Sequence, residues 1–505
     1  MGSMSKPLDT DVVVIGAGNA ALTAALAARE AGAAVTVLER APEELRGGNT
    51  RFTGGIFRFS YPSIDALSEL LEDDEDLSDV IVEPYSSDRY TDDLERLSGG
   101  RNDPELTRVL VDSSYDTVRW LQSFGVRWEF ARTAVEARSN DTGKLGLQLG
   151  AAVRTRGKGP ALSETLFARA LDTGVEILYE SEATGFRFSD DGSLSGVEMT
   201  RGDEPGVIIA CRAAVLGCGG FESNSLLRGR FLGEGWSGVK VRGTRFNTGE
   251  MLFAALEAGA DRAGDWSECH STPIGADSPD FGDLVLGAAT NRLSYPYGIM
   301  INLSGNRFAD EGEDFKLYTY AKMGVEIMRQ PHGLAIQVFD DKATSLLEER
   351  YEHTTPFRSE TVAGLADELE RAYGQLGLTG ASVVETVDTY NAAVQGGAFD
   401  PVVLDGLRTS GLLPEKTNWA QTLDEPPFTA YPVTAGITFT FGGLRIGADA
   451  AVRRSDGEVM PGVFATGEIT GGFFFENYPA GAGLMRGAVF GRIAGQGAAK
   501  AASRR

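Results

Sequence analysis

One short segment near the N-terminus constrains the fold more than any other part of the chain. A run of β-branched residues, Val12–Ile15, predicts a buried strand and leads into a glycine-rich turn. In that turn Gly16, Gly18 and Ala21 form the pattern Gly-x-Gly-x-x-Ala. The first glycine permits a tight turn and the second lets backbone approach a pyrophosphate. The alanine lets the next helix pack closely against the strand.

The residues that follow complete a dinucleotide-binding pattern. Residues 19–31 are rich in alanine and contain no proline, which favours a helix whose first N–H groups face the phosphates. A second apolar run, Val35–Leu38, ends at Glu39, about 20 residues past the glycines, where an acid accepts hydrogen bonds from a ribose. Strand, turn, helix, second strand and acid occur in the required order, so we expect a Rossmann-like unit that binds NAD or FAD.

Length and composition exclude several classes of protein. The 505 residues predict two or more domains, and the net charge of -25 disfavours nucleic acid and anionic membranes as partners. The three cysteines form no Cys-x-x-Cys motif, so we expect no haem, iron–sulfur or other metal site, and their low, odd number suits a reducing cytosol. No signal peptide or bilayer-long apolar stretch is visible, which predicts a cytoplasmic protein without membrane insertion.

Further glycine-rich segments extend the expected ligand site. Residues 46–55 contain four glycines, which would let backbone approach a flat ligand closely. The alternative is a mobile surface loop, but the position directly after the dinucleotide unit favours the ligand. A strand expected over residues 207–216 runs into the turn Gly217–Glu222, where a doubly wound fold brings backbone to its cofactor.

The chain changes in character twice, which predicts an inserted domain. Residues 1–261 hold the dinucleotide unit, 262–436 form a second, α+β domain, and 437–505 return to the first domain. The proline-rich stretch Pro426–Pro432 is expected to be a stiff connector at the end of the insertion. We therefore expect an α/β fold, with a Rossmann-like domain interrupted by an α+β capping domain.

Several motifs occur in one order along the chain and resemble a known family. They are the N-terminal dinucleotide unit, Arg46-Gly-Gly-Asn-Thr50, Gly219-Gly-Phe-Glu222, Gly305-Asn-Arg-Phe308 and Pro461–Glu468. Together they resemble the fumarate reductase/succinate dehydrogenase flavoprotein superfamily, and within it the tricarballylate dehydrogenase-like proteins, over nearly the whole chain. The resemblance implies an FAD domain with a capping domain, an active site at their junction, a small-molecule substrate and an electron acceptor that the sequence does not identify.

The resemblance also assigns cofactor-binding residues. The FAD is expected to be non-covalent, because no histidine near Gly48 matches the one that links FAD in the membrane complexes. Glu468 would bind a ribityl or ribose hydroxyl, and the start of the last helix would stabilise negative charge on reduced flavin. The residues expected at the cofactor are Gly16, Gly18, Asn19, Ala20, Ala21, Glu39, Arg40, Gly47, Gly48, Asn49, Thr50, Thr53, Gly54, Gly55, Ala183, Gly217, Gly219, Gly467, Glu468, Gly483, Leu484 and Met485.

The sequence departs from the fumarate reductases where those enzymes hold their substrate. Phe439 replaces a histidine, Tyr478 replaces an arginine, and Phe315 replaces the arginine that acts as the catalytic acid. Most of the dicarboxylate machinery is therefore missing. The Tyr478-Pro479 pair instead resembles ketosteroid dehydrogenases of the same superfamily. In those enzymes a tyrosine at this place donates a hydrogen bond to a ring ketone, and a second tyrosine takes the α-proton.

These resemblances define the catalytic candidates. Tyr478 would polarise a carbonyl, and either Tyr318 or Tyr320 would be the base, with Lys316 lowering its pKa. His270 would contact substrate, although a structural hydrogen bond explains it equally well. The further substrate-binding candidates are Phe439, Arg58, Arg307 and Ala482, and the cluster of Arg154, Arg156 and Lys158 would hold an anion or form a solvated basic face.

The sequence thus predicts an FAD-dependent dehydrogenase that introduces a C=C bond next to a carbonyl. The substrate would be a small or cyclic oxo or carboxylic acid, such as 4-oxocyclohexanecarboxylate, a ketosteroid-like ring ketone or tricarballylate. Removal of the α-proton would accompany hydride transfer to flavin N5. The alternatives are an enoate reductase running the reverse reaction, a flavin monooxygenase, and a non-catalytic electron-transfer subunit. A monooxygenase usually needs an NAD(P)H site, and no second fingerprint is visible.

Overall fold

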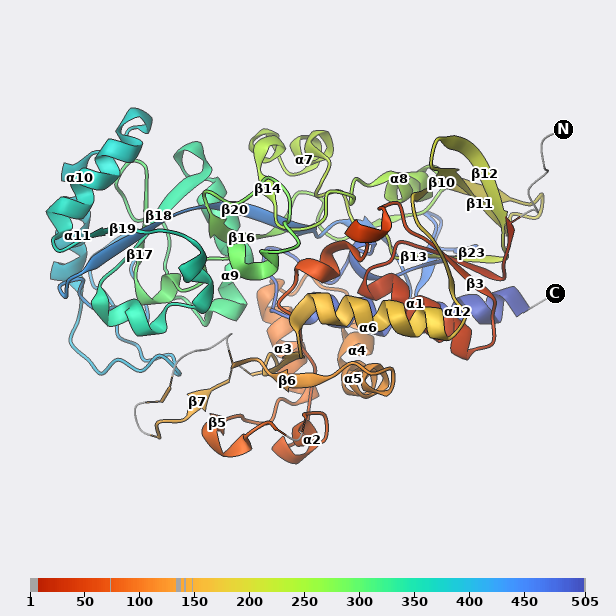
Figure 1. The fold of residues 1–505 in the computed structure, drawn as a ribbon, viewed down its shortest axis with the longest axis horizontal. Helices are drawn as coiled ribbons and strands as arrows, with labels where there is room; N and C mark the ends of the chain where they lie inside the picture. The colour runs from red at the N-terminus through yellow and green to blue at the C-terminus, as the bar shows by residue number, and fades with distance from the viewer. Residues whose placement is uncertain (1–7, 73, 133–137, 140–141, 148, 504–505) are drawn as a thin grey trace.

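The computed structural model describes residues 8–503, apart from 73, 133–137, 140–141 and 148. The molecule is elongated in the view of Figure 1. Helices α10 (Val362–Tyr373) and α11 (Gly380–Ala393) lie at one end, and β12 (Glu204–Ala210) lies near the other. The parallel sheet that contains the dinucleotide motif occupies the same part of the molecule as β12.

That sheet has the strand order β22-β23-β13-β2-β3-β9. All neighbours are parallel except β22, which is antiparallel to β23. The three central strands are buried along their whole length and almost entirely apolar, as expected for a parallel sheet covered on both faces. The strands are β2 (Val12–Ile15), β3 (Val35–Leu38), β9 (Glu176–Leu178), β13 (Ala213–Leu216), β22 (Ala451–Arg453) and β23 (Val459–Ala465).

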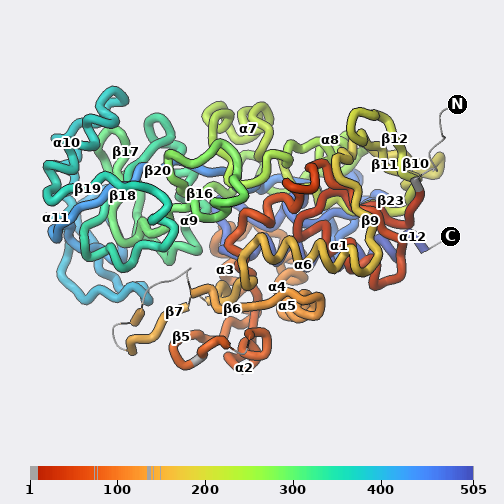
Figure 2. Tube along the Cα trace, viewed as in Figure 1, coloured from red at the N-terminus to blue at the C-terminus, as the bar shows by residue number. Residues whose placement is uncertain are grey.

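The C-terminal helix returns to the N-terminal unit. Helices α1 (Asn19–Glu30) and α12 (Ala482–Ser503) pack side by side (Figures 1 and 2). Gly491 of α12 faces α1 so closely that an added Cβ would lie 2.7 Å from the carbonyl oxygen of Ala20. Because only glycine permits this approach, the packing holds the start of α12 beside the glycine turn that precedes α1.

A second sheet is built around the long strand β20 (Phe428–Thr440). The order is β14-β20-β18-β17, and β16 and β19 also pair with β20. The other strands are β14 (Lys240–Val241), β16 (Cys269–Gly275), β17 (Ile299–Asn302), β18 (Leu334–Phe339) and β19 (Phe357–Ser359), and helix α9 (Lys316–Met328) packs against β16 and β20.

Two of the local predictions are wrong. Residues 426–432 are not a connector, because β20 begins at Phe428 and includes Pro432, opposite Ile336 of β18. Proline lacks only the N–H, and the carbonyl of Pro432 still accepts a hydrogen bond from Ala276 (3.0 Å). Residues 207–216 form two strands instead of one, because the chain leaves β12 at Ala210 and enters β13 in a different sheet.

The remaining elements surround these two sheets. A four-stranded sheet has the order β1-β12-β11-β10, and three smaller sheets are β15-β21, β4-β8-β6 and β5-β7. Their strands are β1 (Leu8–Asp9), β10 (Ser181–Phe188), β11 (Leu194–Arg201), β15 (Arg262–Ala263), β21 (Gly443–Leu444), β4 (Ile56–Phe57), β8 (Val153–Thr155), β6 (Trp128–Phe130), β5 (Val80–Ile81) and β7 (Leu145–Gly146). The other α-helices are α2 (Ile64–Ser68), α3 (Ser87–Leu97), α4 (Pro104–Asp112), α5 (Ser114–Ser123), α6 (Lys158–Asp172), α7 (Ser225–Phe231) and α8 (Glu250–Glu257).

The predicted domain division remains a prediction. The boundary placed between residues 436 and 437 falls inside β20, and β14, which precedes residue 262, pairs with that strand. Within the residues that the structure describes, no helix combines the length and apolar character needed to cross a bilayer.

Candidate active site

A long cleft runs from the glycine turn after β2 to the strands β16 and β20. Segments far apart in the sequence line it. Of the residues expected at the cofactor, those that line the cleft are Gly16, Gly18, Asn19, Ala20, Glu39, Arg40, Gly48, Asn49, Thr50, Thr53, Gly54, Gly55, Ala183, Gly217, Gly219, Gly467, Glu468, Gly483 and Leu484. Ala21, Gly47 and Met485 are not among the lining residues.

Glycines form the inner wall of the cleft because larger residues would not fit. Gly16 has a φ of 96°, and an added Cβ would lie 2.6 Å from the carbonyl oxygen of Gly217. A Cβ on Gly217 would in turn lie 2.8 Å from that of Ala21. Helix α1 begins after Gly18 with no side-chain cap and no acidic residue in its first turn. Its first N–H groups and the positive end of its dipole therefore suit a phosphate.

Glu39 and Arg40 lie where β3 ends and the cleft begins. Burial raises the pKa of Glu39 to about 7, and its carboxylate accepts a hydrogen bond from the N–H of Ala41 (2.8 Å). Arg40 pairs with Glu182 of β10 and with Glu250 of α8, each at 3.0 Å. Arg40 therefore joins three segments at this end of the cleft.

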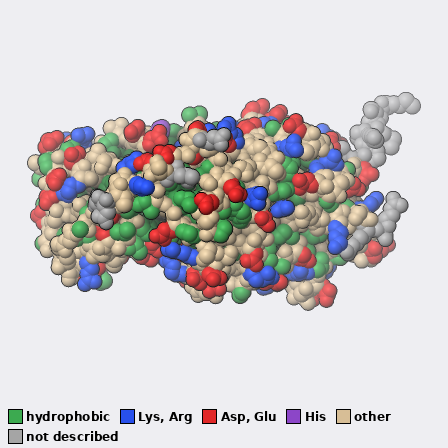
Figure 3. Space-filling model, turned by 90° about the horizontal axis from the view of Figure 1, so that it is seen from below, with side chains coloured by type: hydrophobic (Ala, Val, Ile, Leu, Met, Phe, Trp, Pro, Cys, Tyr) green, Lys and Arg blue, Asp and Glu red, His purple; other side chains and the backbone are tan. Residues whose placement is uncertain are grey.

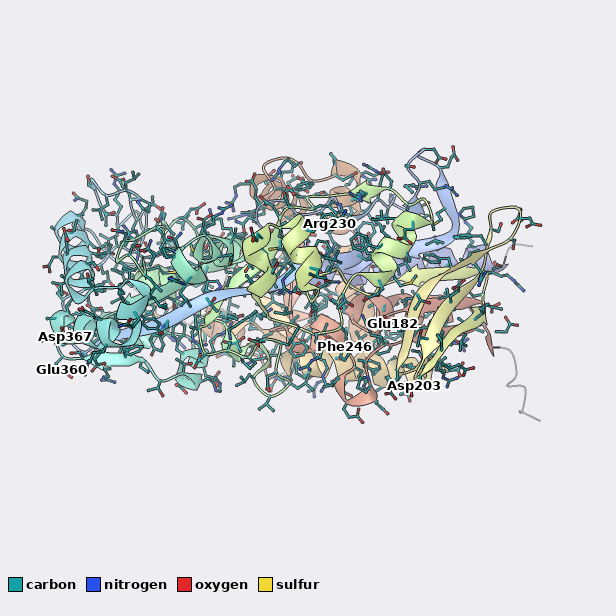
Figure 4. All side chains as sticks on the ribbon, turned by 90° about the horizontal axis from the view of Figure 1, so that it is seen from above. Glu182, Asp203, Arg230, Phe246, Glu360 and Asp367 are labelled. Atoms are coloured by element: carbon teal, nitrogen blue, oxygen red, sulfur yellow. The ribbon has the colours of Figure 1, made fainter. Side chains whose placement is uncertain are left out.

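Figure 4 locates this end of the cleft in the molecule. The lining residues Glu182 and Phe246 lie toward the sheet of β10, β11 and β12. Asp367 of α10, and Glu360 just before that helix, lie at the opposite end of the molecule.

The first turns of helices α1 and α12 are arranged in a way that fits FAD. The side-chain amide of Asn19 donates to the carbonyl of Leu484 (2.8 Å), so the starts of α1 and α12 meet at one point of the cleft. The Oδ1 atom of Asn19 is buried without a hydrogen-bond partner in the described part of the chain. The first turn of α12 contains no acidic residue. Two helix starts, the glycine wall and the acid Glu39 line one continuous cleft, as a flavin dinucleotide requires.

The other end of the cleft brings four predicted residues together. The ring centroid of His270 lies 4.9 Å from the ring centroid of Tyr320 and 4.9 Å from that of Tyr478. The centroids of the two tyrosine rings are 6.2 Å apart. Phe439 lies 5.2 Å from Tyr478. The hydroxyl of Tyr478 accepts a hydrogen bond from the N–H of Gly483 (2.9 Å), which leaves its own proton for a second acceptor.

Burial sets the charge of these groups. It raises the pKa of Tyr320 well above its ordinary value, and the neighbouring Tyr478 raises it further. Burial also raises the pKa of Tyr478. The pKa of His270 is held well below its ordinary value by burial and then by the charge of Arg242. At neutral pH both tyrosines therefore keep their protons and His270 is uncharged.

Tyr318 does not line the cleft. Its hydroxyl donates to Asp93 (2.8 Å) and accepts from Arg58 (3.2 Å). Arg58 is fully buried and also donates to the hydroxyl of Tyr85 (2.9 Å). Tyr318 and Arg58 thus belong to a buried polar network behind the cleft, and of the two tyrosines proposed as the base only Tyr320 faces it.

The other predicted substrate contacts also lie outside the cleft lining. Arg307 forms an ion pair with Glu311, and its guanidinium donates to the carbonyl of Pro414 (2.9 Å). Ala482 is fully buried at the start of α12. The predicted influence of Lys316 on the base is not found, because Lys316 pairs with a buried carboxylate and the pKa of Tyr320 is raised instead of lowered. Arg154 pairs with Glu129 and Arg156 with Asp74, at 2.7 and 2.5 Å.

Several lining residues were not identified from the sequence. They are Arg242, Asn291, Glu348, Arg350 and Arg486. The position of Arg486 near the start of α12, close to Leu484, was a usable signal, and Arg242 lies shortly before the glycine turn at Asn247–Gly249. Glu348 and Arg350 have no motif around them, so only the tertiary fold reveals them. Among the described residues, no group of His, Cys, Asp and Glu side chains is suited to hold a metal ion.

Comparisons with known proteins agree with this geometry. The FAD binding domain family matches residues 11–484 of the chain. The probable fumarate reductase Ifc3 of Shewanella frigidimarina (strain NCIMB 400) is 28% identical over 97% of this chain and 75% of its own length. The 4-oxocyclohexanecarboxylate 2-dehydrogenase of Sinomonas cyclohexanicum is 26% identical over 96% of this chain and 92% of its own length.

A solved structure shares the fold. The 3-ketosteroid-delta4-(5alpha)-dehydrogenase of Rhodococcus jostii RHA1 superposes with a TM-score of 0.68 at 22% identity, covering 98% of each chain. The predicted α/β fold and the resemblance to the fumarate reductase superfamily are confirmed.

Proposed function

The chain belongs to the FAD binding domain family, and we propose that it is a dehydrogenase that introduces a C=C bond next to a carbonyl of a small or cyclic oxo acid. The chain is an FAD-dependent oxidoreductase. One observation supports the specific reaction above all others. Tyr320, Tyr478 and His270 face one another at the end of the cleft that continues from the cofactor-lining glycines.

The residues would act on a substrate carbonyl and on the carbon beside it. Tyr478, held by the N–H of Gly483, donates a hydrogen bond to the carbonyl oxygen and makes the α C–H bond more acidic. Tyr320, after losing its own proton, accepts the α-proton, and the electron pair of that bond forms the C=C bond. FAD, when bound, supplies the acceptor for the hydride that leaves the β-carbon. The substrate thus loses one proton and one hydride.

The walls of this end of the cleft favour a ring-shaped substrate. Phe439 is stacked on His270 with ring centroids 4.9 Å apart and an interplanar angle of 29°. Tyr478, which also lines the cleft, contacts Phe439 edge to face at 5.2 Å. An aromatic lining of this kind suits a cyclic ketone. One relative in the comparisons is named for an oxo acid built on a cyclohexane ring, and it matches over most of its length.

The reverse reaction, reduction of a conjugated C=C bond, is the second candidate. It is supported by the similarity to a probable fumarate reductase. Fumarate itself is disfavoured, because Phe439 and Tyr478 replace the histidine and arginine of those enzymes. Phe315, at the position of the catalytic arginine, packs against Trp419 with ring centroids 5.6 Å apart and does not line the cleft. No observation favours the monooxygenase or the electron-transfer subunit. The expected partners remain a small-molecule substrate and an external electron acceptor, and cytoplasmic location remains a prediction.

Steady-state assays with artificial dyes separate the two directions. We expect the enzyme to oxidise 4-oxocyclohexanecarboxylate with an oxidised dye as acceptor, and to form an α,β-unsaturated oxo acid identifiable by mass spectrometry. With a reduced dye as donor, fumarate is expected to turn over far more slowly. Rapid reduction of fumarate, with no oxidation of any ring oxo acid, would refute the proposal.

A further inference from the structure

Arg242 differs from the other arginines considered as substrate ligands. It lines the cleft, and its guanidinium donates to three neutral oxygens: Asn291 Oδ1 at 2.7 Å, and Thr438 Oγ1 and the carbonyl of Phe52 at 3.4 Å each. Within the part of the chain that the structure describes, no ion pair joins Arg242 to a carboxylate. Arg242 is half-buried, and a cation withdrawn from water without a counter-ion is costly, which indicates that a ligand supplies the anion.

The other candidates already have carboxylate partners. Arg58 lies 3.5 Å from Asp93, and Arg307 pairs with Glu311. Arg154 and Arg156 are paired with acidic residues as described above. Their charges are compensated within the protein, so none of them calls for an anionic ligand.

A second cation lies beside Arg242. Arg350 also lines the cleft, and it forms an ion pair with Glu348 in which Nε lies 2.8 Å from Oε2. The other oxygen of Glu348 pairs with Lys316. Burial alone would raise the pKa of Glu348, but the charges of Arg350 and Lys316 outweigh burial and hold that pKa below its ordinary value. One carboxylate is therefore shared between two cations.

The charge at this end of the cleft is positive, although the protein as a whole is strongly acidic. Burial lowers the pKa of Arg242 to about 10, so the guanidinium is still charged at neutral pH. Arg242 and Arg350 both line this part of the cleft, and the carboxylate of Glu348 is already shared by Arg350 and Lys316. The whole chain has a net charge of -25, and on the face drawn in Figure 3 acidic and basic side chains are interspersed. A positive cleft end in such a protein would favour an anionic substrate over a neutral one.

We propose that Arg242 and Arg350 together bind a carboxylate of the substrate at the end of the cleft beside Tyr320 and Tyr478. The guanidinium group suits this role, because it presents several N–H donors in a plane that matches a carboxylate. Glu348 is then a positioning residue that holds Arg350 in place. This inference rests on the proposed function for the location of the substrate, and it adds that the substrate is an acid held away from the carbonyl that reacts.

The test measures binding without turnover. Cyclohexanecarboxylate, which lacks the ketone, is titrated into the FAD-loaded enzyme, and binding is followed by the difference spectrum of the flavin. Cyclohexanecarboxamide is the neutral analogue. We expect the acid to bind at least about tenfold more tightly than the amide, a ratio that corresponds to about 1.4 kcal/mol. Arg242→Met and Arg350→Met are each expected to weaken binding of the acid at least about tenfold and to leave the amide unaffected.

Two further variants control the result. Arg242→Lys keeps the positive charge and is expected to recover part of the affinity for the acid. Arg245→Met removes an exposed arginine of the same segment, which stacks on Phe281 at 5.3 Å outside the cleft lining, and it should bind the acid like wild type. If Arg242→Met does not retain FAD, Arg350→Met alone decides the question.

The outcomes separate this inference from the proposed function. Equal binding of acid and amide by wild type, no detectable binding of the acid, or unchanged binding of the acid in Arg350→Met would overturn the inference. If the acid binds as expected but no ring oxo acid reduces the flavin, the carboxylate site stands and the proposed reaction fails.

Discussion

The hydroxyl of Tyr478 accepts a hydrogen bond from the backbone N–H of Gly483, 2.9 Å away, in the first turn of α12. This contact fixes the tyrosine oxygen beside the helix start that belongs to the cofactor end of the cleft. Because the backbone uses a lone pair of that oxygen, the phenolic proton remains for a substrate carbonyl. The contact therefore links the position of the proposed hydrogen-bond donor to the position of the cofactor.

Replacing Tyr478 with phenylalanine should remove this donor and keep the ring packing. We expect kcat to fall about 10²-fold or more, because removal of one hydrogen-bond donor to a developing oxyanion typically lowers kcat by that factor. FAD content should not change, since the ring contacts with Phe439 and Phe474 are retained. Steady-state kinetics and the ratio of flavin to protein absorbance provide the measurement. Turnover at the wild-type rate would remove Tyr478 from the mechanism.

If Tyr320 is the base, kcat/KM should depend on pH in a specific way. Burial and Tyr478 raise the pKa of Tyr320 well above its ordinary value, so its deprotonated fraction grows as the pH rises. We expect kcat/KM to increase up to at least about pH 9, and to lose this increase in Tyr320→Phe. The pKa of His270 is shifted in the opposite direction. A profile that levels off below neutral pH would therefore point to His270, or to another group of low pKa, and away from Tyr320.

The pair of Arg58 and Asp93 is predicted to stabilise the fold. Arg58 is fully buried and donates to the carbonyl of Ala480 (2.9 Å) as well as to Tyr85 and Tyr318. Arg58→Met would leave the Asp93 carboxylate without its buried partner, which we expect to lower the free energy of unfolding by about 3–5 kcal/mol. Denaturant unfolding measures the loss.

A matched double variant tests whether the two residues act as a pair. Arg58→Met combined with Asp93→Asn should lose less stability than the sum of the two single variants, because the second change removes the carboxylate charge that has lost its partner Arg58. Additive effects, or an unfolding free energy of Arg58→Met equal to that of wild type, would contradict a structural role for the pair.

The cofactor is predicted to be released by denaturation. The chain has three histidines, and of these His270 lines the cleft, packed among the rings of Tyr320, Phe439 and Tyr478. No histidine accompanies Gly48, where the resemblance would place a covalent link. Acid precipitation should therefore leave all of the flavin absorbance in the supernatant. A washed pellet that stays yellow would show a covalent bond.

The N-terminal unit was predictable because several local signals agree. The strands begin and end as predicted, at Val12–Ile15 and Val35–Leu38, and the helix between them ends at Glu30. Apolar β-branched runs, alanine-rich helix and glycine geometry each indicate the same structure without reference to distant residues. The same agreement explains why most of the residues expected at the cofactor line the cleft.

Long-range contacts explain what the sequence did not reveal. Arg242 follows β14, which reaches the cleft by pairing with β20, almost two hundred positions later in the chain. Arg350 lies in a 3-10 helix, Glu349–His353, with no local pattern that points to a ligand. Pro432 is the opposite case, because a strong local signal against a strand was outweighed by pairing on both sides of β20. Tyr318 and Tyr320 could be told apart only by which of them faces the cleft.

The central claim is that the substrate itself gives the electrons to the flavin. The most direct measurement is anaerobic mixing of the FAD-loaded enzyme with 4-oxocyclohexanecarboxylate in the absence of NAD(P)H, followed in the visible flavin band. The account predicts rapid bleaching of that band and formation of one C=C bond for each flavin reduced. If ring oxo acids, ring ketones and tricarballylate all leave the band unchanged while NADPH bleaches it, the account is contradicted.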